Sequence, residues 1–310
     1  MRTRRIVMLA LPLALFAAAC NTQGSAGGGG ASGTIEIDGS STVFPISEAI
    51  AEEFGGTNPE ANVRVGQSGT GGGFEKFCNG EVDISDASRP IKDEEKQACD
   101  ENGVGLVELK VAIDGLSVVV NPENTFAECL TTTELKSIWE PGSSVQTWRD
   151  VRDDWPAEEI KLYGPGADSG TFDYFTGEVV GEEGASRSDY TQSEDDNVLV
   201  QGVAGDTYAL GYFGYAYYKT NDDEITALGI DSGDGCVAPT DETIKGGDYT
   251  PLSRPLYIYV SSESLGREAV AEFTSFYLDT VNDIISDVGY IELPANELSA
   301  ARQTLEEAVG

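Results

Sequence analysis

The sequence contains no histidine among its 310 residues. A Ser-His-Asp or Cys-His catalytic arrangement is therefore excluded, and so is a metal site built on imidazole ligands. No Cys-x-x-Cys pair occurs among the five cysteines, so we expect no zinc site and no other metal site. A phosphoester hydrolase would need a nucleophile beside a base, or a metal cluster, and neither is visible. We predict a protein that is not an enzyme and needs no cofactor.

Positive charge is also scarce, because 19 Lys and Arg face 54 Asp and Glu and the formal net charge is -35. A chain with this balance is poorly suited to nucleic acid, and we expect it to bind none. The acidic surface favours solubility and would repel an anion at long range. Recognition of an anion would have to come from local donors, with salt screening the repulsion.

The apolar run Ile6–Ala19 follows three arginines and is too short to span a bilayer comfortably, which is typical of an export signal. We predict a signal peptide over residues 1–19. The end of the run, Ala17–Cys20, resembles a bacterial lipobox, so we predict lipidation of Cys20 and anchoring at the outer face of the cytoplasmic membrane or in the periplasm. A plain secretory signal with an incidental cysteine is the alternative. Residues 20–33 read as a lipidated, Gly/Ser-rich tether.

Three predicted strands run into polar, glycine-flanked turns that lead into predicted helices. These turns cover residues 39–42, 66–73 and 164–171. A strand-to-helix turn leaves unpaired backbone N–H groups at the helix start, where the helix dipole favours negative charge. Ser and Thr are also ordinary N-caps, so a single turn would not indicate a site. Three turns that converge would enclose a small tetrahedral anion.

Strands and helices alternate along the chain, which predicts parallel α/β layers. The predicted strands are 34–38, 62–66, 82–85, 106–111, 116–120, 160–163, 210–218 and 256–260. One predicted helix begins near Pro45, and others cover 72–79, 92–102 and 196–204. A further helix follows the Thr131–Glu134 capping box, and another follows the third turn. Apolar residues at helical spacing predict two more helices, over 270–284 and 298–308. The tyrosines between 208 and 218 predict aromatic packing, with a sugar-stacking platform as the alternative; they are Tyr208, Tyr212, Tyr215, Tyr217 and Tyr218.

Seven segments together resemble the phosphate-binding lipoproteins of bacterial ABC phosphate importers. They are Asp38–Pro45, Gly66–Gly73, Asp83–Pro90, Gly164–Phe172, Val198–Val203, Ala209–Gly214 and Pro251–Pro255. The resemblance implies an α/β, two-lobed periplasmic-binding-protein fold of class II type, with phosphate in the interlobe cleft and closure by hinge motion. It implies one lobe from residues 34–113 and 256–310 and another from 114–255. Two crossovers would join them near 112–116 and 253–256.

The resemblance also implies a function. The protein would capture inorganic phosphate outside the cytoplasm, as a lipid-anchored monomer, and deliver it to the permease subunits of an ABC importer. A binder of sulfate, molybdate or tungstate is the alternative within the same class. A phosphate sensor or surface adhesin that does not transport is a further alternative.

The ligands that carry over directly from this family are hydroxyl and backbone donors at the turns. They are Ser41, Thr42 and Val43 in the first turn, Ser68 in the second, and Ser169, Gly170 and Thr171 at the last helix start.

The charged ligands do not carry over. Many family members place an aspartate where this chain has Ser88, and an arginine where it has Pro165. We expect Ser88 itself to be among the phosphate ligands. Here Arg89 follows Ser88 and Asp168 lies in the last turn, so the charges are exchanged. We expect Arg89 to pair with phosphate oxygens and Asp168, or else Asp86, to accept the phosphate proton and so reject sulfate. The alternatives are a surface ion pair for Arg89 and a helix N-terminal charge for Asp168.

Four cysteines are left when Cys20 is set aside, and in an exported protein this even number predicts two disulfides. Three pairings are possible. We favour Cys78–Cys99 and Cys129–Cys236, because each pair would then fall within one proposed lobe.

Overall fold

The computed structural model describes residues 32–167 and 169–310. The predicted signal peptide, Cys20, most of the tether and Asp168 lie outside the described residues. Within the described part of the chain, no helix combines the length and the apolarity needed to cross a bilayer.

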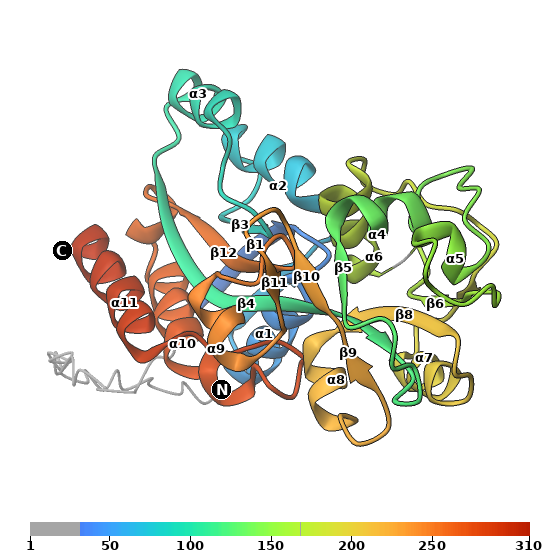
Figure 1. Ribbon diagram of the computed structural model, residues 1–310. Coiled ribbons are helices and arrows are strands. Elements are labelled where there is room, and N and C mark those ends of the chain that lie inside the picture. The colour runs from blue at the N-terminus through green and yellow to red at the C-terminus, as the bar shows by residue number, and fades with distance from the viewer. Residues whose placement is uncertain (1–31, 168) are drawn as a thin grey trace, which may run out of the picture.

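A mixed nine-stranded sheet runs through the described molecule (Figure 1). Its order is β2-β1-β3-β12-β4-β8-β6-β7, and β9 pairs with β4 outside this path. The strands are β1 Gly33–Gly39, β2 Ala61–Val65, β3 Ile84–Ala87, β4 Leu106–Val120, β6 Lys161–Gly164, β7 Thr191–Gln192, β8 Ala209–Gly214, β9 Thr226–Ala227 and β12 Ser253–Ser261. The expected parallel pairing occurs at the two ends of the sheet, whereas β12 runs antiparallel to both β3 and β4.

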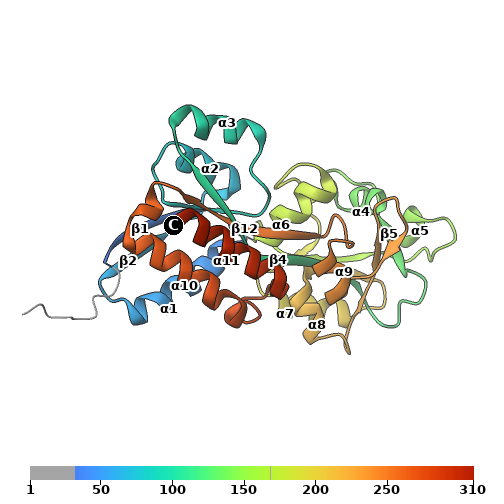
Figure 2. The same ribbon diagram turned by 90° about the vertical axis from the view of Figure 1, so that its left-hand side faces the viewer.

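Helices pack around both ends of this sheet (Figures 1 and 2). The helices are α1 Phe44–Thr57, α2 Gly69–Cys78, α3 Asp93–Asn102, α4 Thr132–Trp139, α5 Trp148–Val151, α6 Gly170–Phe175, α7 Asp196–Ala204, α8 Tyr215–Thr220, α9 Asp241–Gly246, α10 Glu268–Ile284 and α11 Ala295–Val309. We call the part built on β1–β3 with α1–α3, α10 and α11 the first half. The part that contains β6–β8 and α4–α8 is the second half.

Helix α1 shows how the sequence pattern produces the core. Pro45 lies in its first turn, where a missing N–H costs no intrahelical bond. Its buried residues Ile46, Ile50 and Phe54 are four apart and so form one stripe. The ring of Phe54 packs edge-on against Phe273 of α10, with 5.2 Å between the centroids.

Strand β4 is continuous over 15 residues, although the sequence predicts two strands here. It pairs with β12 up to Gly115 and with β8 from Leu116 onward. The polar interruption at Asp114 and Gly115 therefore does not end the strand, because pairing on the sheet satisfies its backbone groups. The strand thus passes from the first half into the second.

The predicted strand over 210–218 is wrong in its second part. Strand β8 ends at Gly214, and helix α8 follows directly. The packing interpretation holds for Tyr212, which is fully buried and stacked on Phe175 with 3.9 Å between ring centroids. Tyr217 is 39% exposed, so the tyrosines do not share one environment.

The ends of β1 and β3 approach each other closely under the first turn. A Cβ atom added at Gly39 would lie 2.1 Å from the carbonyl oxygen of Asp86, and Gly39 has a φ of +148°. Only glycine fits this contact. The Ser40 N–H then donates to the same Asp86 carbonyl over 2.9 Å, which fixes the start of the turn.

The side chain of Asp86 is completely buried in β3. Its Oδ1 accepts a hydrogen bond from Ser47 over 2.9 Å, whereas Oδ2 has no partner in the described structure. Burial raises the pKa of Asp86 to about 8; the Ser47 bond opposes this shift and nearby Asp38 adds to it. The folded protein therefore keeps a proton on Asp86 at neutral pH.

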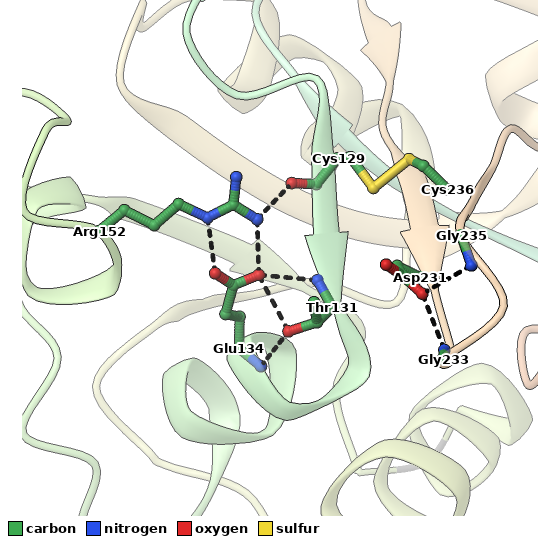
Figure 3. The surroundings of a disulfide bond; sticks show 8 residues. All are labelled: Cys129, Thr131, Glu134, Arg152, Asp231, Gly233, Gly235 and Cys236. Carbon is green, nitrogen blue, oxygen red and sulfur yellow. Dashed lines mark hydrogen bonds and ion pairs between the residues drawn. A yellow bond between two sulfur atoms is a disulfide. The ribbon is translucent and has the colours of Figure 1, made fainter.

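The two disulfides are Cys78–Cys99 and Cys129–Cys236, so the predicted pairing is confirmed. The first joins α2 to α3 in the first half. The second joins β5 (Cys129–Thr131) to β11 (Cys236–Val237), which with β10 (Gly229–Asp231) form a separate three-stranded sheet (Figure 3).

Beside the second disulfide, the predicted capping box is present (Figure 3). The Thr131 hydroxyl accepts from the Glu134 N–H over 3.1 Å, and Glu134 accepts from the Thr131 N–H over 2.8 Å. Nε and Nη2 of Arg152 donate hydrogen bonds to the two oxygens of the Glu134 carboxylate. Nη2 also donates to the Cys129 carbonyl over 3.1 Å. This ion pair ties α4 to the disulfide-bonded strand.

We predict that Asp86→Asn removes part of the pH dependence of stability. The folded pKa lies above the unfolded one, so stability from this group is full below about pH 4 and is lost as the pH rises through 8. The free energy of unfolding, measured with urea, should fall between pH 5 and pH 9. This fall should be larger for the wild type than for Asp86→Asn, by an amount on the order of several kcal/mol. Equal losses in the two proteins would contradict the buried proton.

We predict unequal costs for removing the two disulfides. The Cys129–Cys236 bond closes a separation of 107 residues, and Cys78–Cys99 closes only 21. From the loop-closure entropy of the unfolded chain, we expect the free energy of unfolding to fall by about 5 kcal/mol when the bond of the long loop is removed. Removal of the bond of the short loop should lower it by about 3 kcal/mol. Urea unfolding of the Cys129→Ala/Cys236→Ala and Cys78→Ala/Cys99→Ala proteins tests this order, and the reverse order would contradict it.

Candidate anion-binding site

A cavity of about 330 Å³ lies between the two halves. Residues of the first turn, the α2 start and the segment after β3 line it from the first half. Residues of α6 and of the π-helical turn after it (Thr176–Val180) line it from the second half, and one residue of β12 joins them. The lining residues are Ser40, Ser41, Thr42, Gly69, Thr70, Gly71, Ser88, Arg89, Lys92, Asp173, Tyr174, Gly177, Glu178, Glu183 and Arg254.

The first turn brings Ser41 and Thr42 to the cavity, as the sequence predicts. The Thr42 N–H is used within the turn, because it donates to the Ser40 hydroxyl over 3.2 Å. The N–H groups of Ser41 and Val43 form no hydrogen bond within the described residues. The Val43 side chain is buried, so this residue can offer only its backbone.

The second turn differs from the expectation in one residue. Ser68 is not among the lining residues, and its hydroxyl donates to Asp38, whose other oxygen accepts from Lys76 over 2.6 Å. Thr70 lines the cavity instead, and its hydroxyl lies 3.1 Å from that of Ser88. The two hydroxyls therefore form a pair on this wall.

The last turn meets the first turn across the halves. Ser169 caps α6, since its Oγ accepts from the Thr171 N–H over 3.2 Å. A Cβ atom at Gly170 would lie 2.8 Å from Thr42 Oγ1, so the two turns are in contact. Ser169, Gly170 and Thr171 lie beside the cavity but are not among its lining residues, and Asp168 lies outside the described residues.

Arg89 lines the cavity but already has a carboxylate partner. Its two terminal nitrogens donate to the two oxygens of Glu95 over 2.8 and 2.7 Å, and this hydrogen bonding raises the pKa of Arg89. The guanidinium also lies 5.5 Å from the ring centre of Phe74. The ion pair considered as an alternative for Arg89 is thus present, with Glu95.

Asp86, the second candidate for a proton acceptor, does not line the cavity. Its carboxylate is buried beneath the first turn, where it meets Ser47, and only its backbone carbonyl reaches Ser40. The structure does not bring this carboxylate to a ligand in the cavity.

Among the lining residues that the sequence analysis did not name as ligands, three from the far wall and from β12 have specific contacts: Asp173, Tyr174 and Arg254. Arg254 donates to Thr42 Oγ1 over 2.9 Å and to Asp114 Oδ2 over 3.2 Å. Its guanidinium lies over the ring of Tyr174, 3.6 Å from the centroid. Burial, and then the charge of Glu183, raises the pKa of Asp173, and the nearby Ser41 side chain opposes this shift.

Two of these three had a signal in the sequence. Asp173 follows Ser169 by four residues, and this spacing puts both on one face of a helix. Arg254 lies within Pro251–Pro255, one of the segments that carry the family resemblance, and it is a cation in a chain that has few cations. Nothing in the sequence marks Tyr174, because its role depends on a contact with a residue 80 positions later.

The comparisons with known proteins agree with this geometry. The model of the PBP superfamily domain, which describes the periplasmic-binding-protein fold, matches residues 24–280. The chain is 48% identical to protein SphX of Synechocystis over 94% of this chain and 86% of that one. It is 39% identical to the phosphate-binding protein PstS of Staphylococcus saprophyticus, over 97% and 93% of the two chains.

Among solved structures, a possible phosphate-binding protein from Planctomyces limnophilus matches with a TM-score of 0.88 and 50% identity, over 90% of this chain and 100% of that one. An ABC-type phosphate transport receptor from Vibrio cholerae matches with a TM-score of 0.67 and 26% identity, over 84% and 100%. The predicted fold class is confirmed. The chain therefore belongs to the PBP superfamily and, within it, to the family of phosphate-binding proteins that these relatives represent.

Proposed function

We propose that the protein captures inorganic phosphate outside the cytoplasm and delivers it to an ABC importer. The observation that carries this proposal is the cavity between the halves, which is lined by four residues with hydroxyl groups: Ser41, Thr42, Thr70 and Ser88. Relatives named as phosphate-binding proteins and as an ABC-type phosphate transport receptor support the same ligand and partner. The family is one of binding receptors rather than enzymes.

Neutral donors suit this task. Hydroxyls and backbone N–H groups stabilise an oxyanion without adding charge, and the open N–H group of Ser41 belongs to a residue that lines the cavity. Val43 is fully buried and does not line the cavity, so its N–H would have to become accessible before it could serve as a donor. Ser169, Gly170 and Thr171 would add donors from the second half, since Gly170 touches Thr42. An anion that accepts hydrogen bonds from both halves would stabilise the contact between them.

Ser68 would act indirectly. Its hydroxyl donates a hydrogen bond to the Asp38 carboxylate, which also forms an ion pair with Lys76 of α2. We therefore assign Ser68 to orienting the second turn, so that Thr70 can present its hydroxyl beside Ser88.

For the proton acceptor we propose Asp173, with Asp168 as the other candidate. Asp173 lines the cavity, as does Ser41, and the Ser41 side chain is close enough to affect the pKa of Asp173. A carboxylate at this point accepts the proton of HPO4²⁻ or H2PO4⁻, whereas sulfate has no proton to donate and would face an unpaired like charge.

We further propose that the protein is exported, lipidated at Cys20 and attached through the tether to the outer face of the membrane. The sequence before residue 32 supports this assignment, and the folded body begins with β1 at Gly33. One acyl chain binds a membrane only marginally, so a stable anchor would need more than one.

The direct test of the function is calorimetric titration of the purified mature chain with inorganic phosphate. We expect one phosphate per chain, and an excess of sulfate or molybdate should leave the phosphate affinity unchanged. Competition by either oxyanion at similar concentration would favour the alternative ligand class. Absence of phosphate binding would overturn the proposal.

Asp173→Asn should relax the selectivity of the site. Loss of an ionised acceptor should weaken phosphate binding by about 10- to 100-fold, and sulfate should gain measurable affinity because the like charge is gone. Titrations of Asp173→Asn and Asp168→Asn with both anions separate the two candidates. If only Asp168→Asn admits sulfate, the acceptor is Asp168.

A further inference from the structure

Arg254 is placed differently from the other cations that line the cavity. It lies on β12, its side chain is only 16% exposed, and it faces Asp114 of β4 in the strand register. Its Nη2 reaches Thr42 in the first half, and its guanidinium covers the ring of Tyr174 in the second half. One side chain thus contacts both strands that link the halves and a wall of each half.

The donors of Arg254 are not all in use. Nε meets Asp114 at 3.2 Å and Nη2 meets a neutral hydroxyl, whereas Nη1 has no hydrogen-bond partner within the described residues. Arg89, by contrast, has both terminal nitrogens on Glu95, and Lys92 is exposed at the cavity edge. Of the three cations that line the cavity, Arg254 is therefore the least exposed, and unlike Arg89 it has no carboxylate bound to both of its terminal nitrogens.

The contacts of Arg254 also fix its direction. Asp114 is buried and holds Nε, while Tyr174 supports the guanidinium plane and is itself held by a 2.6 Å bond from its hydroxyl to the Pro251 carbonyl. A guanidinium fixed on two sides loses little entropy when it meets a tetrahedral anion, and its fork geometry suits two oxygens.

We propose that Arg254 is the cation that pairs with phosphate bound in the cavity, and that Asp114 and Tyr174 are positioning residues that aim its guanidinium. This inference rests on the proposed function. It assigns the main cation–phosphate contact to Arg254, on strand β12, and not to Arg89. Arg254 contacts Thr42 of the first half and Tyr174 of the second half. Phosphate paired with Arg254 would therefore bind beside the residue that connects the two halves.

The test is calorimetric titration of inorganic phosphate into folded variants. Arg254→Gln alone would leave the buried Asp114 unpaired, so the decisive comparison is Asp114→Asn against Asp114→Asn/Arg254→Gln. We expect the double variant to bind phosphate about 10- to 100-fold more weakly than Asp114→Asn, because a charge-assisted contact is lost. A purely structural role for Arg254 would give the two proteins equal affinity and would overturn the inference.

Glu134→Gln/Arg152→Gln is the matched control. This pair also combines an arginine–carboxylate contact (Figure 3) with a guanidinium over an aromatic ring. The ring is that of Trp155, 4.5 Å away, and neither Glu134 nor Arg152 lines the cavity. Its removal should leave the phosphate affinity unchanged. Arg89→Gln should weaken binding less than the loss of Arg254, and the opposite order would assign the charge contact to Arg89.

Arg254→Lys provides a second variant if the double variant does not fold. It keeps the charge beside Asp114 but loses the fork and the ring contact, and we expect about tenfold weaker binding. Unchanged affinity in this folded variant would contradict the inference. If the wild type itself binds no phosphate, the proposed function fails, which is a separate result.

Discussion

Strands β4 and β12 form an antiparallel pair through the region where the two halves meet, and the cavity depends on this pair. Asp114 and Arg254 face each other in its register, and the arginine extends from there to Thr42 and Tyr174. A slip of β12 by one residue would turn Arg254 to the face of the sheet opposite Asp114. The change of partner at Gly115, from β12 to β8, carries the same strand into the second half and places α6 opposite the first turn.

The electrostatics of the cavity explain how an acidic chain could hold an anion. Three cations line it, but three carboxylates do so as well: Asp173, Glu178 and Glu183. The formal net charge of -35 opposes anion approach, and physiological salt screens this effect beyond about 8 Å. Selectivity then arises at contact distance, where a partly protonated anion can both accept from hydroxyls and donate to a carboxylate. A fully ionised anion can only accept.

The sequence predicted those features that local patterns determine. The helix over 196–204 and the Thr131–Glu134 capping box are as expected, because spacing and capping chemistry specify them within a few residues. Both disulfides are also as predicted, but that pairing was chosen from the proposed lobes and not from a local pattern. The merging of 106–111 with 116–120 and the helix after Gly214 were missed, since sheet pairing and packing decide them. In the site, the turns were recognisable from their glycines and hydroxyls, whereas Arg254 and Tyr174 become neighbours only in the folded chain.

A crystal structure of the mature protein grown with phosphate would show directly which groups surround the anion. We expect phosphate in the cavity between the halves, with its oxygens about 3 Å from the Ser41 donors and from the Arg254 guanidinium, and with Asp173 in contact. Phosphate bound elsewhere, or held in the cavity by Arg89 while Arg254 makes no contact with it, would show that the proposed site is wrong.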